Sequence, residues 1–162
     1  MVGGGLAGSA AAIWLARAGR PVTLWEKERL PHHKICGEFL SWEAQAFLSD
    51  LGLDVSALGA VDIDRLRLVT ARRTFETRLG FTARSVTRRV LDAALLDMAA
   101  AAGADVQRGV TARELRPGGE VVAGHGVLKA DSLLLATGKS NLRGAVRDGA
   151  GTLNGQLGFK AY

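Results

Sequence analysis

The feature that most constrains this chain is the glycine-rich segment at residues 3–8, with the sequence GGGLAG. Gly3, Gly5 and Gly8 have the spacing of a G-x-G-x-x-G fingerprint, and Glu26 follows 18 residues after the last of them. Glycines at this spacing let a strand turn tightly into a helix and let the backbone approach a diphosphate. An acidic residue about 20 residues further on can accept hydrogen bonds from a ribose. The pattern therefore predicts a dinucleotide-binding βαβ unit.

The residues that follow the glycines support this prediction. Residues 6–18 are mostly small and apolar and predict a buried helix that ends at Gly19, and residues 21–26 (PVTLWE) predict a buried parallel strand. The start of the helix would offer free N–H groups and a partial positive charge to the phosphates. We therefore include Leu6 and Ala7 among the cofactor-binding candidates, together with Lys27 next to the acid.

The carboxylate of Glu26 limits the choice of cofactor. It would accept hydrogen bonds from the adenosine ribose and repel a 2′-phosphate, so the sequence favours FAD or NAD over NADP at this site. Within the loop, Gly3 would make the turn, Gly5 would let the backbone touch the diphosphate, and Gly8 would let the helix pack closely.

The rest of the chain predicts an α/β fold. We expect a Rossmann-like FAD-binding domain in which a βαβ unit and parallel sheet carry an antiparallel hairpin insertion, as one domain over residues 1–162. Trp14, Trp25 and Trp42 are expected to lie in its core or to pack on its sheet. After residue 26 we expect a loop at 27–37, a helix at 42–51 capped by Ser41, and two antiparallel strands at 65–70 and 74–79. An amphipathic helix should run from 87 or 88 to 102, followed by a strand at 105–110 and a hairpin at 114–123. The last expected elements are a strand at 128–136 and the start of another at 159–162.

Both ends of the chain predict a segment of a larger protein. Only Met1 and Val2 precede the glycines, where a strand of about five residues is expected. We expect the first strand and the C-terminal part to be truncated. A central strand that lacks about four buried apolar side chains forfeits roughly 6–12 kcal/mol, at ~1.5–3 kcal/mol each. Because a whole domain has a stability of about 5–15 kcal/mol, the isolated chain should be marginally folded and should bind FAD weakly or not at all.

The charge of the chain is concentrated in arginine. The net charge is +5, and eight arginines but only one acidic residue, Glu76, lie between Arg65 and Arg89. A nucleic-acid interface is disfavoured, because no stacking aromatic residues alternate with these arginines and no nucleic-acid motif is present. We interpret the segment as a solvated hairpin and helix start, with some arginines facing an anionic cofactor as the alternative.

Cysteine and histidine usage gives further expectations. Cys36 is the single cysteine, which excludes a disulfide framework and fits a cytoplasmic protein. His32 and His33 are adjacent and point apart on most backbones, so no metal site is expected. The apolar run near the start is too short to span a membrane, which leaves a peripheral membrane contact open.

Residues 34–41 (KICGEFLS) resemble a known family. They are similar to the FAD-dependent oxidoreductases of the geranylgeranyl reductase and p-hydroxybenzoate hydroxylase-like group, in the aromatic-ring hydroxylase superfamily. Residues 88–92 (RRVLD) are similar to the arginine-containing helix start of that family, and residues 133–138 (LLLATG) to its second FAD-contacting strand and Ala-Thr-Gly turn. With the glycine loop, these blocks occur in the family's order and cover essentially the whole chain.

The resemblance implies a set of cofactor contacts. The glycine loop and Glu26 would hold the ADP half of FAD. The remaining candidates are Lys34, Cys36 and Gly37 toward the isoalloxazine ring, Arg88 near the phosphates and ribityl chain, Val110 with a backbone contact to adenine, and Ala136, Thr137 and Gly138 packed beside the glycine loop. No side chain of this segment is a convincing acid or base, so the catalytic residues stay unassigned. The family's third FAD motif, a Gly-Asp pair, would lie beyond Tyr162.

The resemblance implies the FAD-binding portion of a flavin-dependent oxidoreductase. The reaction would be a monooxygenation or the reduction of a prenyl-type double bond, on a small apolar or aromatic substrate, with NADPH as a candidate electron donor. An NAD-binding dehydrogenase domain is one alternative; it would explain the glycine loop and Glu26 but not residues 34–41. The other alternative is an inactive nucleotide-binding fragment.

Overall fold

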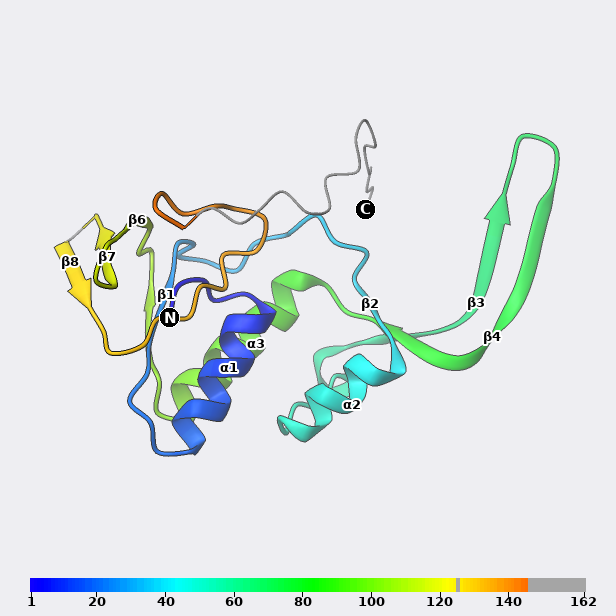
Figure 1. The fold of residues 1–162 in the computed structure, drawn as a ribbon. Helices are drawn as coiled ribbons and strands as arrows, with labels where there is room; N and C mark the ends of the chain where they lie inside the picture. The colour runs from blue at the N-terminus through cyan, green and yellow to red at the C-terminus, as the bar shows by residue number, and fades with distance from the viewer. Residues whose placement is uncertain (125, 146–162) are drawn as a thin grey trace. The chain divides into compact units, whose positions relative to one another are not determined.

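The computed structural model describes residues 1–124 and 126–145, so the strand expected at 159–162 lies outside the described residues. The chain divides into two compact units. One unit consists of Met1–His32 and the chain from Asp92 onward, and the other of His33–Leu91. Figure 1 shows the elements of each unit along the chain.

A parallel sheet forms the centre of the first unit. Its strands β1 (Thr23–Glu26) and β5 (Asp105–Arg108) pair in parallel along their whole length. On the other side of β1, Val2 forms parallel bridges both to Trp25 and to Leu135. The segment before the glycines therefore lies between two neighbours, and its expected central place in the sheet is confirmed.

Hydrogen bonds on both sides fix this short central segment. The Val2 amide donates to the carbonyl oxygen of Leu134 at 2.9 Å, and the Ala136 amide donates to the carbonyl oxygen of Val2 at 2.7 Å. On the β1 side, the Trp25 amide donates to the carbonyl oxygen of Met1 at 3.0 Å. The chain thus enters the glycine loop from a fully paired strand segment.

The helix after the glycines, α1 (Leu6–Arg17), has the predicted position and length. It contacts β1, and its buried residues are Gly8, Ser9, Ala12 and Ile13. Gly19 has φ +70° and its amide donates to the carbonyl oxygen of Ala16 at 2.9 Å, which ends the helix in the left-handed conformation that favours glycine. The βαβ order is therefore confirmed.

A small antiparallel sheet follows β5 in the first unit. It consists of β6 (Ala112–Arg116), β7 (Glu120–Ala123) and β8 (Gly126–Lys129), in that order. The continuous strand predicted over 128–136 is wrong. Residues 126–129 pair antiparallel with β7, whereas Leu135 runs parallel to Val2, and the chain bends at 131–132 between these two pairings.

The core of the first unit joins its two sheets. Val2, Trp25, Val121 and Ala123 form a buried cluster. Partly buried apolar side chains pack against this cluster, namely Val110, Ala112, Leu115, Leu128, Leu133 and Leu135. The core expected for Trp25 is confirmed, but Trp14 and Trp42 are 56% and 58% exposed, so that expectation is wrong for both.

The second unit contains a three-stranded antiparallel sheet in the order β2–β4–β3. Its elements are β2 (Phe39–Leu40), α2 (Trp42–Asp50), the short 3₁₀ helix Ser56–Leu58, β3 (Val61–Val69) and β4 (Thr74–Ser85). The predicted cap of α2 is confirmed, because the Ser41 hydroxyl accepts a hydrogen bond from the Ala44 amide at 3.4 Å. Figure 1 shows β3 and β4 as a long ribbon, longer than the predicted strands because pairing continues past an irregularity between Ile63 and Arg65.

Several arginines of this hairpin form surface ion pairs. Arg65 and Arg67 both reach the Glu76 carboxylate, with N–O distances of 3.2 and 2.7 Å. Hydrogen bonds from Arg67 and, to a smaller extent, from Arg65 hold the pKa of the Glu76 carboxyl below its usual value. Arg84 pairs with Asp62 at 3.0 Å. These contacts fit the interpretation of a solvated hairpin for these arginines.

A long helix connects the two units along the chain. This helix, α3 (Arg88–Ala101), buries Leu91, Leu95 and Ala99, as the predicted amphipathic pattern requires. Over residues 1–124 and 126–145, none of the helices has both the length and the apolar character needed to cross a bilayer.

The buried centre of β1 gives a first test of this fold. Leu24 is fully buried, whereas Val127 on β8 is 53% exposed. We expect Leu24→Ala to lower the free energy of unfolding by about 2–5 kcal/mol, because it removes apolar contacts and leaves a cavity. The matched control Val127→Ala should change it by less than about 0.5 kcal/mol. Urea unfolding of the intact protein with either substitution checks this, and equal losses would contradict the described core.

Candidate nucleotide-binding site

The turn at Gly3 requires glycine for two reasons. Its φ of +103° is one that residues with a side chain rarely adopt, and an added Cβ would overlap the carbonyl oxygen of Ala136. The Gly3 amide donates to the carbonyl oxygen of Trp25 at 2.8 Å, so the turn begins directly from the sheet. The tight turn expected at this glycine is confirmed.

Gly8 packs against the same turn from the first turn of α1. An added Cβ at Gly8 would overlap the carbonyl oxygen of Gly3 and would lie 3.2 Å from the Cβ of Ala136. Ala136 therefore lies against both glycines, at the place beside the loop that the resemblance implies. Its contact with a cofactor stays a prediction.

The start of α1 is open to an anion. Gly5 is its N-cap, with φ −76° and ψ −171°, and neither a capping side chain nor an acidic residue in the first turn neutralises the helix end. The first amide with an intrahelical bond is that of Ser9, which donates to the carbonyl oxygen of Gly5 at 2.9 Å. Helix geometry leaves the amides of Leu6, Ala7 and Gly8 without such an acceptor. With the helix dipole, these N–H groups favour a negatively charged ligand.

Glu26 lies against the glycine loop and is only 7% exposed. Its Oε2 accepts a hydrogen bond from the Gly4 amide at 2.7 Å, and its Oε1 accepts one from the Glu28 amide at 3.0 Å. An ionised carboxylate has about four acceptor positions, so these two bonds leave capacity for sugar hydroxyls. The structure therefore adds a second role to the predicted one, since Glu26 also fixes the shape of the loop.

The fingerprint alone did not identify two residues that shape this loop. A Cβ at Gly4 would lie 2.8 Å from Cδ2 of Leu96 and 3.0 Å from Oε2 of Glu26. Ser9 is fully buried, and its hydroxyl donates to the carbonyl oxygen of Gly4 at 3.1 Å. Two features of the sequence could have pointed to them: Gly4 lies in a run of three consecutive glycines, and Ser9 lies within an alanine-rich helix.

The other candidates of the first unit are Lys27, Val110, Thr137 and Gly138. Lys27 is exposed and lies 3.7 Å from the carboxylate of Glu28. The Val110 amide donates to the carbonyl oxygen of Glu26 at 3.0 Å, which ties the end of β5 to the end of β1. After Ala136, the Thr137 hydroxyl donates to the carbonyl oxygen of Ser140 at 2.6 Å, and Gly138 has φ +64°, so these residues form a turn.

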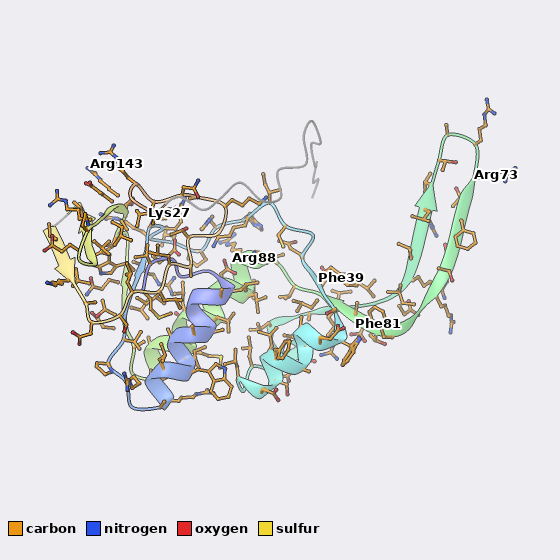
Figure 2. The ribbon with its side chains drawn as sticks, viewed as in Figure 1. Lys27, Phe39, Arg73, Phe81, Arg88 and Arg143 are labelled. Atoms are coloured by element: carbon orange, nitrogen blue, oxygen red, sulfur yellow. The ribbon has the colours of Figure 1, made fainter. Side chains whose placement is uncertain are left out.

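The remaining candidates belong to the second unit. Lys34, Cys36 and Gly37 lie in the loop before β2, and Arg88 lies at the first position of α3 (Figure 2). The structure brings Cys36 and Arg88 together around Glu38, a residue that was not among the predicted candidates. The Glu38 amide donates to Sγ of Cys36 at 3.5 Å, and Oε1 of Glu38 accepts from the Arg88 amide at 3.1 Å.

Within residues 1–124 and 126–145, the structure forms no group of three or more His, Cys, Asp or Glu side chains that could hold a metal ion.

Comparison with known proteins agrees with this geometry. Residues 1–61 match the model of an NAD(P)-binding Rossmann-like domain. Menaquinone reductase of Mycolicibacterium smegmatis is 49% identical over 53 residues, which are 33% of this chain and 13% of that protein. Tetrameric 2-methyl-3-hydroxypyridine-5-carboxylic acid oxygenase superimposes with a TM-score of 0.69 at 30% identity, over 80% of this chain and 36% of that one. A flavoprotein/dehydrogenase from Cytophaga hutchinsonii does so with a TM-score of 0.64 at 25% identity, over 77% and 34% of the two chains.

The expected resemblance to the FAD-dependent oxidoreductases is confirmed. The fold class, a Rossmann-like α/β domain with parallel and antiparallel sheets, is confirmed as well. This chain spans about a third of the length of these solved structures and 13% of the length of the menaquinone reductase.

The close packing at Gly8 can be tested by one methyl group. We expect Gly8→Ala to lower the free energy of unfolding by about 1–3 kcal/mol or more, because the new Cβ meets backbone that cannot move aside. Gly124→Ala is the matched control in the same unit, because nothing lies within 4 Å of its added Cβ. Thermal unfolding of both variants measures the difference, and an unchanged Gly8→Ala variant would contradict the described loop.

Proposed function

We propose that this chain is the FAD-binding portion of a flavin-dependent oxidoreductase, with residues 1–162 as one cofactor-binding domain. The observation that carries the proposal is the open start of α1 next to the buried carboxylate of Glu26. The first would take the diphosphate through the amides of Leu6 and Ala7, and the second would take the adenosine ribose. Gly5 would allow the diphosphate to approach the backbone.

FAD fits the observations better than NADP or NAD. The negative charge of Glu26 disfavours a 2′-phosphate on the ribose, which argues against NADP. An NAD-binding dehydrogenase domain explains the glycine loop equally well. The solved structure of a flavoprotein at 25% identity and the resemblance of residues 34–41 to flavin enzymes favour FAD.

When bound, FAD supplies the redox chemistry, and the residues of this chain bind and orient it. Val110 would contact adenine through its backbone, and Ala136, Thr137 and Gly138 would support the glycine loop. In the second unit, Arg88 would pair with phosphate, and Lys34, Cys36 and Gly37 would lie toward the flavin ring. Lys27, next to Glu26, would add positive charge near the adenosine end.

The reaction of the whole protein is part of the proposal. The two predicted reactions are monooxygenation and reduction of a prenyl-type double bond. Relatives of this chain are named as an oxygenase and as a menaquinone reductase, which supports an oxidoreductase of one of these two types. We propose a small apolar or aromatic substrate, NADPH as electron donor and a cytoplasmic location. Flavin absorbance in the purified intact protein separates a flavin enzyme from an NAD-binding domain or an inactive fragment. NADPH oxidation measured with and without O₂ separates monooxygenation from reduction.

The anion site at α1 can be tested by charge alone. Ala7 is exposed in the first turn of the helix. We expect Ala7→Asp to weaken FAD binding roughly tenfold or more, because the new carboxylate repels the diphosphate at close range. The same carboxylate interacts favourably with the helix dipole, by about 0.3–1 kcal/mol, so the variant should be no less stable than the parent.

The isosteric variant Ala7→Asn serves as the control. It has nearly the same size as aspartate but no charge, so its dissociation constant for FAD should stay within about threefold of the parent value. Fluorescence titration of the intact protein measures both variants. Equal FAD affinities for the Asp and Asn variants would show that the diphosphate does not lie at this helix end.

A further inference from the structure

Glu38 combines two unusual properties. Its backbone has φ +54°, which makes it the only non-glycine residue with positive φ in the described part of the chain. Its side chain is nevertheless buried, at 8% exposure. A residue with a side chain is strained in this conformation, and such strain persists only where surrounding contacts enforce it. The contacts that enforce it here should therefore indicate what the residue does.

The first contact is with the start of α3. Oε1 of Glu38 accepts a hydrogen bond from the Arg88 amide at 3.1 Å, across 50 residues of sequence. The Thr87 hydroxyl accepts one from the Val90 amide at 3.4 Å, so two different side chains cap this helix end. A carboxylate at a helix N-terminus is favourable through the helix dipole. Glu38 thus fixes the backbone of Arg88, from which the guanidinium side chain extends.

The second contact is with the loop that precedes β2. The Glu38 amide donates to Sγ of Cys36 at 3.5 Å, while β2 begins at the next residue, Phe39, which is paired with Ser85 of β4. One residue therefore joins the 34–37 loop, the edge of the antiparallel sheet and the start of α3. The amide and the carboxylate of Glu38 thus both have partners within the second unit.

We propose that Glu38 is a positioning residue that holds Arg88 in place to pair with a phosphate group of FAD. The inference rests on the proposed function of the chain. Glu38 itself would not touch the cofactor, since its carboxylate would repel a phosphate. It would act by fixing the first turn of α3, and so the direction from which the Arg88 side chain leaves the helix.

A double-mutant cycle tests this proposal in the intact protein, with the FAD dissociation constant as the readout. Glu38→Ala removes the hydrogen-bond acceptor, and we expect about a tenfold loss of affinity. Glu38→Gln keeps an acceptor oxygen and should stay within about threefold of the parent. In an Arg88→Gln background, Glu38→Ala should cost less than about twofold further, because the residue it positions is no longer cationic.

A second variant guards against general unfolding. Glu38→Gly removes the carboxylate and also the backbone strain, so it should stay folded and lose about the same affinity as Glu38→Ala. Full additivity of Glu38→Ala and Arg88→Gln, or an unchanged FAD affinity in Glu38→Gly, would overturn the positioning role. Absence of FAD binding in the parent protein would instead overturn the proposed function, so the two failures are distinguishable.

Discussion

The hydrogen bond between the buried carboxylate of Glu26 and the Gly4 amide is the contact on which the rest of the site depends. Burying a carboxylate is unfavourable unless donors satisfy it, and here two backbone amides do so. The bond connects the end of β1 to the turn that follows the central strand segment, and the Ser9 hydroxyl donates to the carbonyl oxygen of the same residue, Gly4. At the start of α1, no side chain caps the first amides. The acid that sequence patterns associate with a sugar thus also shapes the loop that would meet the diphosphate.

A second polar arrangement of the same kind occurs in the other unit. There a buried carboxylate, that of Glu38, satisfies the first amide of α3, whereas the carboxylate of Glu26 satisfies a loop amide before α1. The consequence for the helix ends differs. The start of α1 lacks a capping side chain and so can accept an external anion, while α3 is closed by protein groups and presents an arginine side chain instead. In general, an uncapped helix start favours an anion through its amides, whereas a guanidinium group pairs with phosphate through its own charge.

Local patterns in the sequence predicted much of this structure. The glycine turn, α1 with its end at Gly19, the Ser41 cap of α2 and the apolar stripe of α3 depend on nearby residues, and all were found as expected. The strand predicted at 128–136 failed because an apolar run does not reveal its partner, and this one divides between β7 and Val2. Gly4, Ser9 and Glu38 were missed for a related reason. The roles of Gly4 and Glu38 come from contacts with residues 22 and 50 positions away, which periodicity and composition do not register. The role of Ser9 comes from a buried hydrogen bond to the Gly4 carbonyl oxygen, which a pattern of small residues does not reveal. Trp14 and Trp42 were also predicted wrongly, because residue type alone does not predict that these two side chains are exposed.

The central claim is that the start of α1 and Glu26 bind the diphosphate and the ribose of FAD. The most direct measurement is a structure of the intact protein with FAD bound. The account predicts a diphosphate oxygen within about 2.7–3.2 Å of the Leu6 or Ala7 amide nitrogen, and a ribose hydroxyl at the same distance from a Glu26 carboxylate oxygen. A bound FAD whose phosphates lie away from this helix end, with Glu26 contacting only the loop amides, would contradict it.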